Sequence, residues 1–403
     1  MRRITKRGVI ILLLSILLLM SLGAIAFGEC NNCDKNNTNS NFTGTVGVEF
    51  TFTPISAVSY DIISDVSASF TIEGFSIGMQ TSFDLSGFQS LGVNCSIDLG
   101  AFNIGENILF DPYFSWNDFS LSGQIVGVEL GLDLILADIG TTQTPSYSMG
   151  AVFSLKSGVI DGFSITALTG FGATDLVNAL DGVEAPFSHD LLYLYYHLDS
   201  LYNPTNNLKV TIVPGFYFEE EFVRLEVNTG GLLASSNTWL DTSGFSKEIL
   251  EFGYQFTEPK LAFLTALTID DSFSLSGLDF ILDIQIDPVR FTSKTSFAPP
   301  SSPLSIPVVF DSQGFAISFD FYGVTVTSET DFDYSFMFSQ ELIGIETTID
   351  PVTFTSLTKF DTTGFAGEWL VAKVKFSGVT LSTEVNFDFT GITKASFGFS
   401  LTF

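Results

Sequence analysis

Only two histidines are available for imidazole chemistry in this chain of 403 residues. Both lie in one stretch, where Ser188 and Asp190 flank His189 and where His197 follows a few residues later. Three adjacent residues cannot form a Ser/His/Asp triad by themselves, because neighbouring side chains point to opposite faces of a strand and fan apart on a helix. The pattern favours polar residues at the boundary of an element. We therefore expect no catalytic residues and no enzyme.

Two other motifs could bind a metal ion. Alternation along a strand places at most two carboxylates of 219–221 on one face, which favours a solvated strand end over a cation site. Cys30 and Cys33, spaced as C-x-x-C in an Asn-rich tail, could form a local disulfide, bind metal or carry redox chemistry, and the local disulfide is favoured. No EF-hand loop, zinc spacing, phosphate-binding loop or dinucleotide fingerprint is present. We expect neither a metal nor a cofactor.

The composition combines high hydrophobicity with a strong negative charge. Hydrophobic residues make up 45% of the chain and charged residues 15%, yet the formal net charge is −29. Disorder requires low hydrophobicity, so the acidic residues cannot be interpreted as a solvating tail. Nucleic-acid binding needs a basic surface, and this chain has none. Both classes are excluded.

The N-terminus has the pattern of an export signal. Residues 1–26 begin with four basic residues, continue through an apolar run from Val9 to Leu22 and end on Ala24-Ile25-Ala26, a pattern that signal peptidase recognises. The alternative is a retained membrane anchor, but the apolar run is shorter than the ~20 residues of a spanning helix. We interpret 1–26 as a cleaved signal peptide and 27–41 as an Asn-rich tail. No later segment is apolar enough for a spanning helix, so a mature chain in a membrane must cross it with strands.

From residue 42 to residue 403 the chain alternates between apolar and polar residues, as strands with one apolar face do. The clearest case is the last segment, where Thr393, Ala395, Phe397, Phe399, Leu401 and Phe403 share one face and Lys394, Ser396, Gly398, Ser400 and Thr402 share the other. Similar alternation extends over 91–99, 324–338 and 379–389. In the first of these segments Cys95 falls on the apolar face, where we expect it to be inert.

Two repeats indicate hairpins. The pattern (Phe or Leu)-Asp-x-x-Gly-Phe occurs at 83–88, 240–245, 310–315 and 360–365. Its Asp can accept backbone N–H groups at the start of a turn, and its Gly can take the positive φ of a type I turn with a bulge. Residues 286–297 recur in similar form 63 positions later at 349–360. We predict tight turns at the four Asp-x-x-Gly sites and no catalytic role for their aspartates.

Many consecutive hairpins leave an open sheet with two edges and a wide apolar face, which aggregates in water. A closed barrel removes the edges, and a bilayer covers the apolar face while Asp, Glu, Thr and Ser face a wet lumen. A soluble two-sheet sandwich has the same alternation. Single sandwiches do not hold this many strands, however, and no linker divides the chain. We predict an all-β, antiparallel, up-and-down transmembrane barrel over 42–403.

The chain resembles bacterial outer-membrane β-barrels of the general porin class. The features that carry the resemblance are the signal peptide, the alternation over the whole mature chain and a last strand that ends in an aromatic residue. The resemblance implies an outer-membrane location in a diderm bacterium, contact with outer-membrane lipid, and recognition of 392–403 by the barrel assembly machinery. The residues of this assembly signal are Phe397, Phe399, Leu401 and Phe403.

Two features depart from that class, and strand number follows from length. Most turns look short at both rims, which argues against an inward-folded constriction loop, and the aromatic residues are mainly Phe, with 43 Phe against 11 Tyr and 3 Trp. The segment 173–190 is the least strand-like and could contain a helix that narrows the lumen. At ~14 residues per strand and turn we predict about 24 strands, with an error of four.

The predicted function is passive diffusion of small hydrophilic solutes through an acidic lumen that favours cations. The candidate pore-lining carboxylates are Asp320, Glu329, Asp331, Asp333, Glu384 and Asp388. A structural or surface scaffold with a blocked lumen is the alternative, and an outer-membrane enzyme is the weakest alternative because of the two-histidine inventory. The sequence leaves the solute and the oligomeric state open.

Overall fold

The computed structural model describes residues 40–54, 59–72, 74–111, 113–141, 144–176, 208, 210–258, 260–300 and 308–403. The predicted signal peptide, the cysteine pair at 30 and 33, and the two histidines lie outside these residues. Within the described ranges no helix has the length and apolar character needed to cross a membrane.

The described chain folds into 24 β-strands. The first twelve are β1 (Ser40–Thr53), β2 (Ser59–Ile72), β3 (Phe75–Asp84), β4 (Gly87–Asp98), β5 (Phe102–Phe110), β6 (Phe114–Ile125), β7 (Val128–Asp138), β8 (Tyr147–Ser157), β9 (Phe163–Phe171), β10 (Ala173–Thr174), β11 (Thr211–Ile212) and β12 (Phe218–Thr229). The others are β13 (Leu232–Asp241), β14 (Gly244–Phe256), β15 (Lys260–Ile269), β16 (Leu275–Ile286), β17 (Val289–Ala298), β18 (Val309–Phe321), β19 (Val324–Phe332), β20 (Phe338–Ile349), β21 (Val352–Asp361), β22 (Gly364–Phe376), β23 (Val379–Asp388) and β24 (Gly391–Thr402).

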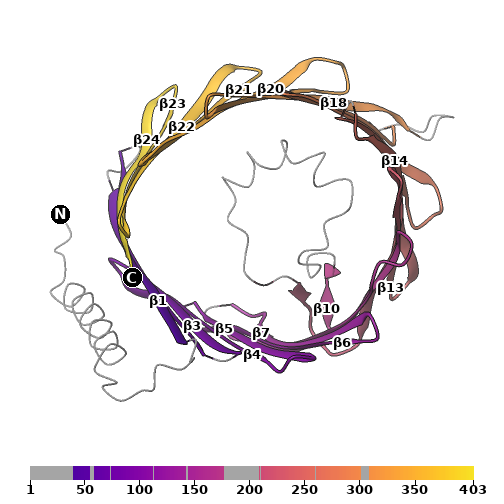
Figure 1. Ribbon diagram of the computed structural model, residues 1–403, viewed down its shortest axis with the longest axis horizontal. Helices are drawn as coiled ribbons and strands as arrows, with labels where there is room; N and C mark the ends of the chain where they lie inside the picture. Colours follow the sequence, from indigo (N-terminus) through magenta and orange to yellow (C-terminus); the bar gives the residue numbers. More distant parts are fainter. Residues whose placement is uncertain are drawn as a thin grey trace.

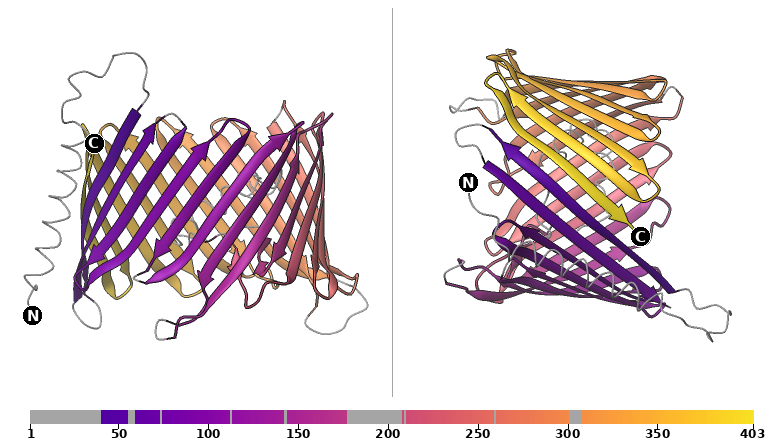
Figure 2. Two further views of the ribbon diagram at one scale, coloured as in Figure 1. Left: turned by 90° about the horizontal axis from the view of Figure 1, so that it is seen from below. Right: turned by 90° about the vertical axis from the view of Figure 1, so that its left-hand side faces the viewer.

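Twenty-two of these strands form one closed antiparallel barrel. Each strand pairs with its neighbour in sequence, except that β9 pairs with β12 and the last strand β24 pairs with β1 (Figure 1). The strands are strongly tilted against the barrel axis (Figure 2). The prediction of an all-β up-and-down barrel is confirmed, and 22 strands fall within the predicted range.

The barrel closes where the two ends of the chain meet. Opposite Thr45 in β1 lies Thr402 in β24, and the pairing continues to Phe52 opposite Ala395. Beyond it the N–H of Gly44 donates to the carbonyl of Phe403 over 2.8 Å, and the N–H of Phe403 donates back over 2.9 Å. The terminal residue thus lengthens the seam by two hydrogen bonds.

The two rims of the barrel differ in their connections. One rim, here called the short-turn rim, holds the start of β1, the end of β24 and most of the tightest turns, including 126–127, 230–231, 287–288, 322–323, 350–351 and 377–378. The opposite rim, here called the loop rim, holds 139–146, 299–308 and the connection from β9 to β12. Most connections are short at both rims, as expected, but the three longest all leave the loop rim.

Three of the four predicted Asp-x-x-Gly turns are confirmed at the loop rim. Gly87, Gly244 and Gly364 have φ of 130°, 115° and 112°, and the preceding aspartates accept turn N–H groups. The fourth prediction, 310–315, is wrong, because Asp311 and Gly314 lie within β18 and the chain turns before them. An unpredicted turn of the same kind joins β23 to β24, where Gly391 has φ of 128°.

Candidate channel lumen

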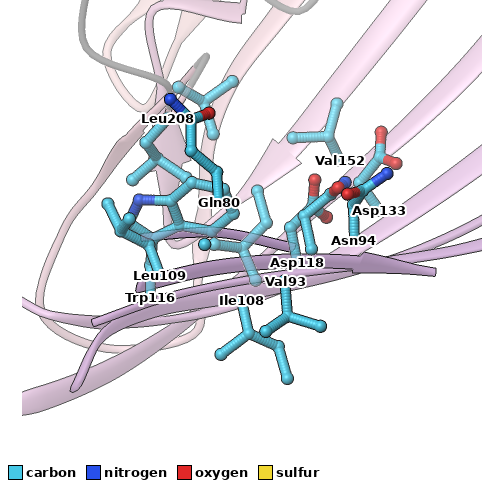
Figure 3. Close-up of a pocket in the computed structure, with 14 residues that line it drawn as sticks. Gln80, Val93, Asn94, Ile108, Leu109, Trp116, Asp118, Asp133, Val152 and Leu208 are labelled. Carbon is cyan, nitrogen blue, oxygen red and sulfur yellow. The ribbon is translucent and has the colours of Figure 1, made fainter. Parts of the chain in front are cut away.

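The two faces of the barrel wall are distinguished by strand alternation and by the segment inside the barrel. Asn94, Asp118 and Asp133 lie on the side of the sheet that faces Leu208, whereas Val93 and Ile108 point to the other side (Figure 3). Residues directly opposite each other on paired strands share a face. The register of the 22 strands therefore assigns every barrel position to the lumen or to the outside.

Four predicted carboxylates face the lumen by this register. Asp320 lies opposite Thr325 and accepts a hydrogen bond from its hydroxyl, and the carboxylate of Asp331 accepts a hydrogen bond from Nε2 of Gln340 over 2.9 Å. Glu329 is buried on the same strand as Asp331. Glu384 accepts a hydrogen bond from Nζ of Lys394 over 3.1 Å.

The other two predicted carboxylates lie at the loop rim, Asp333 in a turn and Asp388 at the last position of a strand. Asp333 accepts the N–H groups of Ser335 and Met337, at 2.8 Å and 3.0 Å. Asp388 ends β23 and accepts the N–H of Thr390 over 2.7 Å. The sequence pattern placed Asp333 on a strand face because the alternation of apolar residues continues through the turn. The alternation at 324–338 runs along β19 and through the turn 333–337 to Phe338, the first residue of β20.

The wall formed by β16 to β24 carries both signs of charge. Asp283 accepts the Nε of Arg290 over 2.8 Å and the hydroxyl of Thr292 over 2.9 Å. Lys294 lies 3.8 Å from the carboxylate of Asp279. Register adds Lys359, Lys373 and Lys375 to the same lumen surface. Basic residues therefore offset much of the negative charge along this wall.

The arc formed by β1 to β7 differs in the charge of its lumen face, and none of the predicted pore-lining residues lies on it. Its lumen face includes the carboxylates of Glu49, Asp61, Asp65, Asp118 and Asp133. No lysine or arginine occurs between Lys35 and Lys156, so this arc contains no basic residue. The absence of basic residues over this long segment is visible in the sequence. Its effect on the lumen follows only from the closed barrel, in which the segment forms one continuous wall.

A buried network surrounds Arg224 on the neighbouring part of the wall. Its Nε donates to Oδ1 of Asn237 over 2.6 Å, and its guanidinium lies 5.5 Å from the ring centre of Phe222. The carboxylate of Glu251 accepts the Nδ2 of Asn237 over 3.2 Å and the hydroxyl of Ser235. Arg224 and Glu251 therefore belong to one hydrogen-bonded unit, in which their opposite charges offset each other.

The connection between β9 and β12 enters the lumen. Its described parts, 172–176 and 210–217, contain the short sheet of β10 and β11 (Figure 1). Leu176 and Ile212 join a buried cluster with the wall residues Val152, Leu168 and Phe222. This inner apolar patch departs from the expected polar lumen face, and it gives the insert a place to pack.

Hydrogen bonds also fix the insert. The hydroxyl of Ser148 on β8 donates to the carbonyl of Val213 over 2.8 Å, and the N–H of Leu176 donates to Glu220 over 3.3 Å. Glu220 faces the lumen and Glu221 faces outward, as alternation predicts. The chain therefore folds inward here, which corrects the doubt about a constriction loop and agrees with the expectation that an insert beginning in 173–190 could enter the lumen. The predicted helix in 173–190 lies mostly outside the described residues.

A cavity of about 340 Å³ lies between the insert and the β3–β8 wall (Figure 3). Its polar lining comes from Gln80, Asn94, Asn107, Asp118 and Asp133, and its apolar lining includes Leu208 and Val210 of the insert. Among the described residues no group of three or more His, Cys, Asp or Glu side chains is placed to share a metal ion. The base-free arc and the insert thus line the same cavity.

No family model matches the chain. No curated protein matches it either. Among solved structures, mutants of the porin of Rh. blastica are similar: one has 11% identity and a TM-score of 0.38, covering 90% of this chain and 100% of that chain. Another has 12% identity at the same TM-score and the same coverage. At these scores the fold of this chain rests on its own strand pairing.

Proposed function

We propose that this protein is a bacterial outer-membrane channel for passive diffusion of small hydrophilic solutes, and that its acidic lumen favours cations. The supporting observation is the division of one closed wall into two surfaces. Outside, large apolar side chains are exposed, such as Phe252 at 50% and Phe263 at 48%. A continuous surface of this kind is a hazard in water, and lipid covers it.

The lumen surface supports the electrostatic part of the proposal. Carboxylates along a pore raise the local concentration of cations and exclude anions. A barrel of 22 strands measures about 44 Å between backbones, from the strand spacing and a tilt of about 40°. Screening limits the field of a carboxylate to ~8 Å at physiological ionic strength. Cations are therefore favoured along the base-free arc and in the space that the insert narrows, and only weakly in an open centre.

Planar-bilayer recording tests the proposal. The purified protein is expected to form steady, passive channels, with a reversal potential in a KCl gradient that shows preference for K⁺ over Cl⁻. Anion preference would show that the inner carboxylates do not set selectivity. Single-channel currents without cation preference would retain the channel and remove the electrostatic part.

A structural barrel with a blocked lumen is the second candidate, and a specific observation favours it. The described parts of the insert lie inside the barrel and are anchored to the wall by apolar packing and hydrogen bonds. Protein that inserts into bilayers in both orientations yet never conducts would support the scaffold and contradict the channel.

A further inference from the structure

The outer face of the barrel carries a belt of polar side chains a few residues in from the loop rim. Strand register places all of them on the same face as the exposed apolar residues. The outer belt consists of Glu106, Glu248, Gln313, Glu341 and Glu368. Four of these residues lie on the arc from β14 to β22, and Glu106 lies on β5 in the other half of the barrel, so the belt is not confined to one patch.

The belt acids share one local geometry. Each accepts a hydrogen bond from a side chain on the neighbouring strand of its hairpin: Glu248 from Ser236 at 2.9 Å, Glu341 from Ser328 at 3.1 Å and Glu368 from Ser356 at 3.2 Å. On the other half, Glu106 accepts the Nδ2 of Asn117 over 3.0 Å. The recurrence in four hairpins shows a built feature of the outer surface.

A single hydroxyl or amide donor does not replace the hydration of a carboxylate. Moving an ionised carboxylate into hydrocarbon is expensive, and residues of this kind are rare on the lipid face of membrane proteins. Water or polar headgroups must therefore reach the belt.

The apolar surface on the short-turn side of the belt has the height of a hydrocarbon layer. On β14 the outward residues after Glu248 are Leu250, Phe252, Tyr254 and Phe256, and β22 continues in the same way from Leu370 to Phe376. Eight residues of a tilted strand span about 20 Å, close to the apolar band of about 25 Å on such barrels. The part of the barrel between the belt and the short-turn rim is thus tall enough to cross the acyl layer.

Between the belt and the loop rim, about 10 Å of wall remains, from four residues of a tilted strand. Phenylalanines dominate its outer face, and their rings pack on one another. Phe245 stacks on Phe273 at 4.6 Å between ring centres, and Phe310 on Phe336 at 5.3 Å. We call the stacked phenylalanines of this strip the Phe collar. Rings that cover each other expose less apolar surface to lipid, and aromatic residues are common at the headgroup level.

We propose that the acyl layer of the membrane ends at the outer belt, so that the belt and the Phe collar lie in the headgroup layer of the leaflet on the loop-rim side. The partner of the outer face is then an acyl layer about 20–25 Å thick, bounded by the belt and the short-turn rim. This inference rests on the proposed membrane location and does not depend on conduction.

Depth-dependent quenching of tryptophan fluorescence tests the boundary. The three native tryptophans, Trp116, Trp239 and Trp369, face the lumen and give a background that lipid quenchers do not reach. Glu341→Trp and Ile345→Trp form a matched pair on the outer face of β20, and the second lies midway between the belt and the short-turn rim. Both variants are folded into phosphatidylcholine vesicles that contain lipid brominated either deep in the acyl chain or near the headgroup.

Deep bromine is expected to quench Ile345→Trp several-fold more than Glu341→Trp, and shallow bromine is expected to reverse the order. Equal deep quenching of both would place the belt inside the acyl layer and overturn the inference. Quenching of neither would put the barrel outside the bilayer and overturn the proposed function as well, so the two failures differ.

Lysine substitutions at the same positions give a second readout that uses no probe. Ile345→Lys is expected to lower the folding equilibrium constant in vesicles by about 30-fold or more, the cost of a base near the midplane, and Glu341→Lys by less than about fivefold. A comparable loss in both variants would contradict a boundary at the belt.

Discussion

Aspartates at the loop rim act through the backbone of the turns. In the turn from β15 to β16, Asp270 accepts the N–H groups of Ser272 and Ser274, each at 3.0 Å, and the hydroxyl of Ser272 at 2.7 Å. Hydrogen bonds from the Ser272 hydroxyl and the Ser274 N–H hold the pKa of Asp270 below its ordinary value of 3.8. The folded turn thus favours the ionised form of this carboxylate.

The sign of the pH dependence follows from that direction. A carboxyl with a lower pKa in the folded state binds fewer protons there than in the unfolded state, so its contribution is complete above the ordinary value of 3.8 and is lost as pH falls through the folded pKa. Asp270→Asn keeps the acceptor oxygen and removes the titration. In urea unfolding from vesicles, we expect the wild type to lose more stability than Asp270→Asn below pH 3.8. Parallel pH profiles would contradict this role.

The insert illustrates how an element can reverse the local polarity of a lumen. Leu176 is completely buried against the inner wall, although the lumen around the insert is lined mainly by polar side chains. Burial of a leucine side chain is worth about 1.5–3 kcal/mol, enough to decide whether so short a sheet stays attached.

We expect Leu176→Asp to detach the β10–β11 sheet from the wall and to leave the barrel folded, because no barrel strand depends on it for pairing. Single-channel conductance should rise, while the heat-modifiable migration of the barrel stays unchanged. Thr211→Ala, at an exposed position of the same sheet, is the matched control. An unchanged conductance in Leu176→Asp would show that the insert does not limit the pathway.

The terminal strand gives a second prediction at the scale of an element. Phe397, Phe399 and Leu401 face outward, and Phe403 bonds to Gly44 across the seam. Deletion of Phe403, or Asp at both 399 and 401, is expected to leave the protein in the periplasm and degraded, because the predicted assembly signal is lost. Ser400→Ala, on the lumen face of the same strand, serves as the control. Normal outer-membrane levels of the two disruptive variants would contradict the signal.

At the scale of the whole molecule, charge is distributed unevenly around the lumen. The arc from β1 to β7 has carboxylates without bases, whereas the wall from β16 to β24 combines acids with lysine and arginine. A cation should therefore follow the first wall. This asymmetry makes the position of a carboxylate more important than the total charge.

Two triple variants compare the walls at an equal change of charge. Neutralising Asp65, Asp118 and Asp133 to Asn is expected to shift the reversal potential in a KCl gradient further toward zero than neutralising Asp320, Asp331 and Glu384 to their amides. The difference should be largest at low salt, where screening is weakest. Equal shifts would mean that cations do not follow the base-free arc.

The sequence alone determined the local properties of the chain. Alternation over segments such as 393–403 has a period of two, and that period is a property of an extended backbone, so strands, their apolar faces and the approximate strand number follow from it. The apolar face of Cys95 was obtained in the same way, and the register confirms it. Tight turns were predicted correctly at three of the four Asp-x-x-Gly sites.

Tertiary structure decided everything that depends on distant parts of the chain. Alternation gives no sign of where a strand ends, so Asp333 was assigned to a strand face although it lies in a turn. Pairing of β1 with β24 closes the barrel, and only closure turns a base-free segment into a wall. The side chains of the inner apolar patch and of the outer belt have their partners on other strands. The register between strands decides which residues become partners, and a single strand does not encode that register.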